Sequence, residues 1–101
     1  MAKMTYLVHI HLAPRDPDML LPTLSAAAIA GSTTHPGVVH VVVHPLARPH
    51  PVIGLYIREA TLDQAETSAR QVWRHAVVSE PWLDNWDLVC AEVPLIMVFD
   101  G

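Results

Sequence analysis

The sequence predicts an α+β domain whose elements follow the order βαββαβ. Four stretches alternate apolar and polar residues with the period of a strand, one long stretch repeats apolar residues with the period of a helix, and 101 residues suffice for one core. Right-handed connections then favour a four-stranded antiparallel sheet with two helices on one face. We therefore expect a single domain, 1–101, with the first and third strands central, the fourth beside the first, and the second at the far edge.

The strands are indicated by period-two alternation and by many β-branched residues. Four strands are expected at residues 5–12, 38–44, 52–59 and 87–93. The segment 45–51 contains three prolines and is expected as a stiff loop of a hairpin, since proline cannot donate to a sheet ladder. Residues 95–99, which follow Pro94, are expected as a short further strand, either extra or exchanged with another copy.

The first helix is expected from the segment Asp16-Pro17-Asp18, which offers an N-cap, a proline at the first helical position and an early acid. It should run to about Ala30 and stop at Gly31. Pro22 lies awkwardly inside this span, so the helix either kinks there or begins near Leu21.

The second helix has the clearer signals. Thr61 and Gln64 have the spacing of a capping box, and Pro81 ends the segment. Apolar residues recur at three- and four-residue steps and form one stripe, made of Leu62, Ala65, Ala69, Val72, Trp73, Ala76 and Val77. The segment 82–86 is expected as the turn into the last strand.

Composition narrows the function classes. Ten acidic residues against six basic ones give a net charge of −4, and no run of Lys or Arg offers a surface for nucleic acid. Cys90 is the single cysteine, which excludes an internal disulfide and suits a cytoplasmic protein. No signal peptide is evident, and no apolar run approaches the roughly 20 residues that cross a bilayer. With 51% hydrophobic and 16% charged residues, we expect a homo-oligomer, most simply a dimer.

Strand parity predicts two unlike faces of the sheet. The face toward the helices should carry Tyr6, Val8, Ile10, Val39, Val41, Val43, Ile53, Leu55, Ile57, Val89, Ala91 and Val93. The other face should carry Leu7, His9, His11, Val38, His40, Val42, His44, Gly54, Tyr56, Arg58, Leu88, Cys90 and Glu92. Four of the seven histidines therefore share one face with the only cysteine.

Three chemical interpretations of that face compete. In the first, a second copy covers it, and the mixed residues line a cavity for a small organic molecule, where histidines transfer protons near neutral pH. In the second, His9, His11 and Cys90, or Glu92 in its place, bind zinc or copper, while His40 and His44 lie two strands away. The third, a nucleophilic Cys90 with a histidine base, is the weakest, because no positive group near Cys90 is expected to activate it.

The arrangement of elements over residues 6–93 resembles the ferredoxin-like class, in particular the dimeric α+β-barrel group. That group includes cofactor-free monooxygenases, polyketide cyclases and lactone isomerases. The resemblance rests on layout without a diagnostic motif, so it assigns no catalytic residue. It implies a homodimer that needs no cofactor and binds a small organic ligand.

The leading hypothesis is thus a homodimeric small-molecule-binding protein, with acid–base chemistry on an aromatic or polyketide-like substrate if it is an enzyme. Its candidate catalytic residues are His9, His11 and Tyr56, and its candidate substrate-binding residues are His40, His44, Arg58 and Glu92. The main alternative is a non-catalytic interaction or regulatory domain that docks a protein partner through the same face or the proline loop. Neither a nucleic acid nor a membrane is expected as a partner.

Overall fold

The computed structural model describes residues 2–94. Its elements, in chain order, are β1 (Met4–Pro14), α1 (Leu24–Ser32), β2 (Val38–His44), β3 (Val52–Glu59), α2 (Leu62–Ser79), the 3-10 helix η1 (Pro81–Asn85) and β4 (Trp86–Glu92). This order confirms the predicted βαββαβ layout. The strand expected at 95–99 lies outside the described residues.

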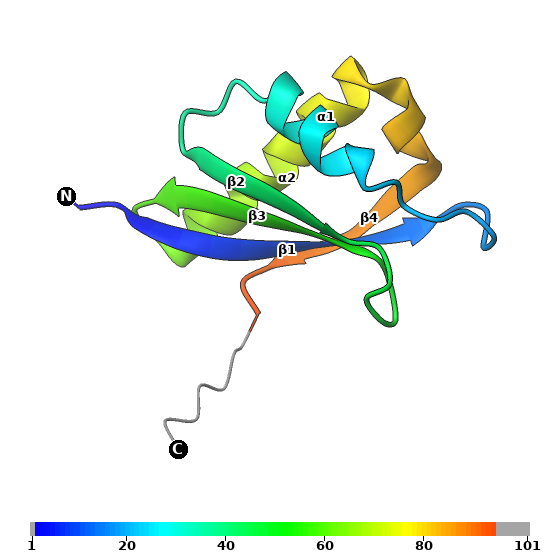
Figure 1. Cartoon of the computed structure of the whole chain (residues 1–101). Coiled ribbons are helices and arrows are strands. Elements are labelled where there is room, and N and C mark those ends of the chain that lie inside the picture. The colour runs from blue at the N-terminus through cyan, green and yellow to red at the C-terminus, as the bar shows by residue number, and fades with distance from the viewer. Residues whose placement is uncertain (1, 95–101) are drawn as a thin grey trace.

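The four strands form one antiparallel sheet in the order β2-β3-β1-β4, which is the ferredoxin-like arrangement (Figure 1). The central pair is β1 and β3, β4 lies beside β1, and β2 lies at the far edge, as predicted. Both helices cover the same side of the sheet, and Figure 1 shows them above it. The opposite side carries no described helix.

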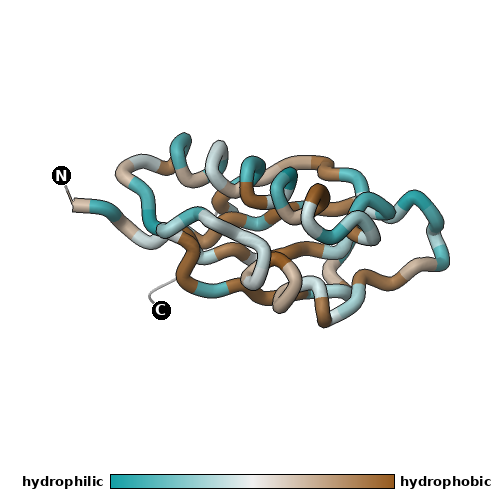
Figure 2. Tube along the Cα trace, turned by 90° about the horizontal axis from the view of Figure 1, so that it is seen from above, coloured by the Kyte–Doolittle hydropathy of each residue, from teal (hydrophilic) through white to brown (hydrophobic). Residues whose placement is uncertain are grey.

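The core lies between the sheet and the helices. Val8, Ile10 and Leu12 of β1 and Ile53, Leu55 and Ile57 of β3 are buried there. Helix α2 supplies Ala65, Ala69, Val72, Trp73 and Ala76, and its turns alternate between hydrophilic and hydrophobic when seen from above (Figure 2). Each fully buried aliphatic side chain contributes roughly 1.5–3 kcal/mol to stability, so this layer is the main source of folding free energy.

Both edge strands carry a register shift, and each shift corrects the predicted faces. The pairing of β2 with β3 shifts between Val38 and His40, and that of β1 with β4 shifts between His11 and Leu12. Because a bulge adds one unpaired residue, it reverses the side on which the neighbours point. Val39 and Val89, predicted to face the helices, are 56% and 50% exposed, whereas Val38 and Leu88, predicted on the other face, pack against the core.

Helix α1 begins later than its first predicted start. Asp16 accepts a hydrogen bond from the backbone N–H of Asp18 at 3.0 Å and so forms a turn rather than a helix cap. Pro22 comes just before the N-cap Thr23, so the helix begins beyond the proline instead of kinking at it. Gly31 lies inside the last turn and does not stop the helix, which ends at Ser32.

The signals read for α2 are confirmed. Thr61 Oγ1 accepts a hydrogen bond of 3.1 Å from the backbone N–H of Gln64, as the capping box predicts. Leu62, which was placed on the apolar stripe, is 43% exposed because it lies in the first turn. Across residues 2–94, none of the helices is both long and apolar enough to cross a membrane.

Candidate functional site

The side of the sheet away from the helices is called the open face below. The strand register arranges its residues in rows that run across the sheet from β2 to β4. One row contains Val42, Gly54, His9 and Glu92, and the next contains His44, Val52, His11 and Cys90. These two rows bring together three of the four histidines that the sequence placed on this face.

Gly54 lets histidines from two non-adjacent strands approach each other. His9 on β1 and His44 on β2 are separated by β3, yet their ring centroids lie 6.2 Å apart. A Cβ at Gly54 would lie 2.7 Å from Cγ2 of Val42 and 3.8 Å from Nε2 of His44. The missing side chain thus leaves room for His44 to lean toward β1, which the expected separation of two strand spacings did not foresee.

His11, Cys90 and Glu92 form the tightest group of potential metal ligands. One ligand atom from each lies within 4.8 Å of the other two, and Nε2 of His11 is 3.2 Å from Oε1 of Glu92. This Nε2 is buried and has no hydrogen bond of acceptable geometry within residues 2–94. A buried nitrogen without a hydrogen bond is costly, so the arrangement leaves one lone pair or proton of His11 unsatisfied.

The local electrostatics oppose a positive charge on His9. Burial lowers the pKa of His9, and the neighbouring His11 and His44 lower it further, against the opposing effect of Glu92. Burial raises the pKa of the Cys90 thiol, with added contributions from Glu92 and Glu66. The thiol is accordingly not activated as a nucleophile, in line with the sequence argument against a catalytic Cys90.

The remaining predicted residues lie toward the other edge of the open face. Tyr56 of β3 pairs with His40 of β2, and their ring centroids are 5.8 Å apart. Arg58 is exposed two residues further along β3. The predicted catalytic set therefore divides: His9 and His11 neighbour each other, with centroids 6.2 Å apart, while Tyr56 lies in the row of His40 and Leu7.

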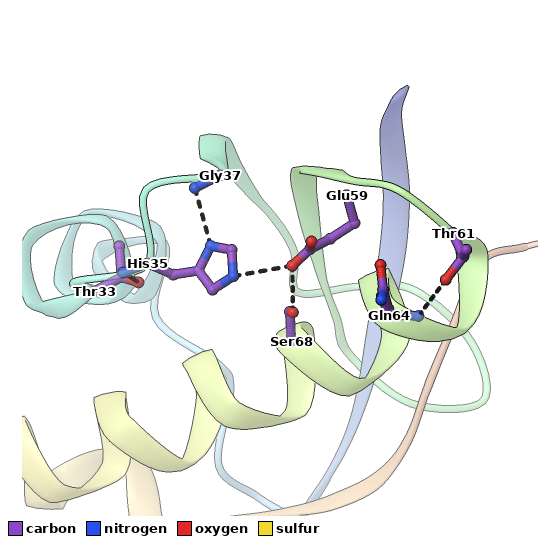
Figure 3. Close-up of polar contacts among 7 residues, drawn as sticks. All are labelled: Thr33, His35, Gly37, Glu59, Thr61, Gln64 and Ser68. Atoms are coloured by element: carbon purple, nitrogen blue, oxygen red, sulfur yellow. Dashed lines mark hydrogen bonds and ion pairs between the residues drawn. The ribbon is translucent and has the colours of Figure 1, made fainter. Parts of the chain in front are cut away.

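A second polar cluster, which the sequence did not reveal, lies at the end of β3 beside α2 (Figure 3). Nε2 of His35 is 3.0 Å from Oε2 of Glu59, and Ser68 Oγ donates a hydrogen bond to the same oxygen. Nδ1 of His35 accepts the backbone N–H of Gly37 at 3.0 Å. His35, Glu59 and Ser68 belong to three separate segments, so only the tertiary fold brings them together; the side chain of Glu59, only 13% exposed, offers no periodic signal.

This second cluster does not have the geometry of nucleophilic catalysis. A nucleophilic serine needs a histidine base within hydrogen-bond reach, whereas here the carboxylate of Glu59 stands between Ser68 and His35. The hydrogen bond from Ser68 lowers the pKa of Glu59, and the nearby His35 and Lys3 lower it further against the effect of burial. A carboxylate stabilised in this way is a weak base, so the cluster is a structural tie between β3, α2 and the loop before β2.

Two clefts lie beside residues of the second polar cluster and of the open face, and neither is lined by His9, His11 or Tyr56. A cleft of about 560 Å³ beside Glu59 and Ser68 is lined mainly by polar residues of α2, and one of about 330 Å³ lies between α1 and β2, with His40 at its wall. The largest of these does not touch the open face. Comparison with protein-family models, curated proteins and solved structures finds no match to the chain.

Proposed function

We propose that the protein binds a zinc ion on its open face through His11, Cys90 and Glu92. The observation that carries this proposal is the convergence of one nitrogen, one sulfur and one oxygen ligand atom within 4.8 Å of one another. Zinc is bound in proteins by these three kinds of ligand, at about 2.0–2.3 Å. Closing the group around an ion needs a movement of about 1 Å, which the exposed side chains of Cys90 and Glu92 can make by rotation.

The position of His11 supports the same proposal. Its Nε2 is buried, points toward Glu92 and has no hydrogen bond within the described residues. A zinc ion bound there would satisfy that nitrogen and would balance the negative carboxylate beside it. In the sheet, Cys90 of β4 pairs with His11 of β1, and Glu92 pairs with His9, two residues before His11 on the same strand. The pairing of these two strands therefore holds the three ligands His11, Cys90 and Glu92 near one another.

Titration with Co²⁺ tests this proposal, because Co²⁺ takes tetrahedral zinc sites and absorbs strongly when a thiolate is bound. The wild-type chain should develop a thiolate-to-cobalt absorption band that saturates at one equivalent and disappears when Zn²⁺ is added. Cys90→Ser should lose the band. His11→Ala should weaken zinc binding at least about 100-fold, since even partners outside the ligand shell are worth 10–100-fold.

His75→Ala is the matched control, because His75 is an exposed histidine on α2 outside the ligand group. It should bind Co²⁺ as the wild type does. A wild-type chain that shows no thiolate band, or a band that survives Cys90→Ser, would overturn the proposal.

The second candidate function is the binding of a small organic molecule between two copies of the chain. It is favoured by the apolar side chains of the open face, since Leu7, Val42 and Tyr56 are only partly exposed although no described helix covers them. In that case His9, His11 and Tyr56 would transfer protons to an aromatic or polyketide-like ligand, and His40, His44, Arg58 and Glu92 would bind its oxygens.

Native mass spectrometry of the purified protein separates the two candidates. An organic adduct retained by a dimer after treatment with a chelator supports small-molecule binding. A mass shift of one zinc per chain that the chelator removes supports the metal site.

A further inference from the structure

The proposed zinc site is short of one ligand. Zinc in structural sites is tetrahedral with four protein ligands, whereas this group supplies three. Cys90 and Glu92 are both exposed, so the fourth position faces away from the chain's own sheet. His9 and His44 are not part of the group, although they lie on the same face. The fourth position is therefore open either to water, as in catalytic zinc sites, or to a ligand from outside residues 2–94.

The row arrangement of the open face indicates where such a ligand lies. Consider a second copy stacked on the open face by a two-fold axis parallel to the strands, between β3 and β1. This operation places β2 of one copy over β4 of the other and leaves every row at its own height along the strands. His44 and Cys90 are at opposite ends of one row. The backbone of His44 of the partner subunit would thus lie over Cys90, and its ring would turn away from Gly54 toward the ion.

The spacing between packed sheets suits this contact. Two sheets pack face to face at about 10 Å. A histidine extending from one sheet and a cysteine extending from the other together span most of this gap, which leaves a zinc–ligand bond of about 2.0–2.3 Å within reach. His40, four residues earlier on β2, would lie about 13 Å away along the strand and would be too distant to bind the same ion.

The charges of the open face favour the same stacking. The carboxylate of Glu92 lies on the edge strand β4 of the open face. A two-fold axis along the strands places β4 over β2, so the Glu92 carboxylates of the two copies lie at opposite edges of the stacked sheets. An axis across the strands would instead place β4 over β4 and bring the two Glu92 carboxylates toward each other.

We propose that a second copy of this chain covers the open face and that His44 of the partner subunit is the fourth ligand of the zinc bound by His11, Cys90 and Glu92. This inference rests on the proposed zinc site. It makes zinc a link between the two copies, with two equivalent ions in each dimer. Dimerisation then depends on zinc, and zinc affinity depends on dimerisation.

Sedimentation of the full chain with and without zinc tests the inference, together with zinc affinity. The wild type should shift from monomer toward dimer when zinc is added and return when a chelator removes it. His44→Ala should remain a monomer in zinc and bind the ion at least about tenfold more weakly. His75→Ala is the matched control, since His75 is an exposed histidine on α2 and lies outside the open face, and it should behave as the wild type.

A mixing experiment distinguishes ligation by His44 from a general effect on folding. Neither His44→Ala by itself nor Cys90→Ala by itself should dimerise when zinc is added. Mixed in equal amounts, they should form a hybrid dimer with a single zinc, because the first variant supplies His11, Cys90 and Glu92 and the second supplies His44. A mixture that stays monomeric overturns the inference.

The outcomes also separate this inference from the proposed function. A wild-type chain that binds zinc as a monomer, with the same affinity after His44→Ala, refutes the shared site and leaves the three-ligand site standing. A wild-type chain that binds neither Zn²⁺ nor Co²⁺ refutes both.

Discussion

At the scale of single residues, Glu59 is the partly buried charged residue with the best-defined surroundings. Its carboxylate accepts from Ser68 and contacts His35, and these contacts lower its pKa below the ordinary value of 4.5. A carboxyl whose pKa is lower in the folded chain stabilises the fold at pH values above the unfolded pKa. That stabilisation is lost as the pH falls from about 4.5 through the lower folded pKa.

We therefore expect Glu59→Gln to destabilise the protein by about 1–2 kcal/mol at pH 7, since hydrogen bonds to a charged group contribute more than neutral ones. The difference from the wild type should shrink below pH 4.5. Denaturant unfolding across this pH range measures it. Asp87→Asn is the control: it removes the same charge from an exposed pair with Arg15, 3.0 Å away, which should contribute little. A difference that stays constant with pH would refute the charged role of Glu59.

Gly54 is the second residue whose role can be tested by itself. A Cβ at this position would approach Cγ2 of Val42 to 2.7 Å. Valine has few favourable rotamers, so its side chain cannot easily rotate away from this contact. We expect Gly54→Ala to cost about 1–3 kcal/mol as an overpacked site, despite the higher strand propensity of alanine. Thermal unfolding checks the direction. A stabilised variant would show that Val42 moves freely and that the glycine is not needed for the approach of His44 to His9.

At the scale of elements, α1 contains a glycine with no packing reason. A Cβ at Gly31 meets no atom within 4 Å, and the residue lies inside the helix. Gly31→Ala should raise the free energy of unfolding by about 0.5–1 kcal/mol, because alanine loses less conformational entropy in a helix. Equilibrium unfolding measures the change, and an unchanged or lower stability would contradict it.

The elements also show how far the sequence determines this structure. The spans 38–44 and 52–59 match β2 and β3, because clear alternation and the prolines between them leave little freedom in the register. The bulges near Val39 and Val89 could not be predicted, since period-two parity assumes an uninterrupted ladder. Of the two predicted starts of α1, the one near Asp16 was wrong, because Asp16 caps a turn as readily as a helix.

The sequence likewise predicts one part of the candidate site and misses another. Parity placed His9, His11, Cys90 and Glu92 on one face, and the register of β1 with β4 places all four in two adjacent rows. Which of them share an ion depends on side-chain directions that alternation does not encode. The His35–Glu59–Ser68 cluster was missed because its members lie on a loop, a strand end and a helix that meet only in the folded chain.

At the scale of the whole molecule, a zinc ion bound only by the folded chain must stabilise it. At a free zinc concentration 100 times the dissociation constant, the stabilisation is about 2.7 kcal/mol, which corresponds to a rise of roughly 10 °C or more in Tm for a domain of this size. We expect this rise in the wild type and in His75→Ala, and its absence in Cys90→Ser. Thermal scans with zinc and with a chelator measure it. An equal rise in Cys90→Ser would mean that zinc binds elsewhere.

X-ray absorption at the zinc edge of the zinc-loaded protein identifies the atoms bound to the ion. We expect one sulfur at about 2.3 Å, together with nitrogen and oxygen ligands at about 2.0–2.2 Å. The sulfur contribution should vanish in Cys90→Ser. A zinc ion surrounded by nitrogen and oxygen alone in the wild type would contradict the site formed by His11, Cys90 and Glu92.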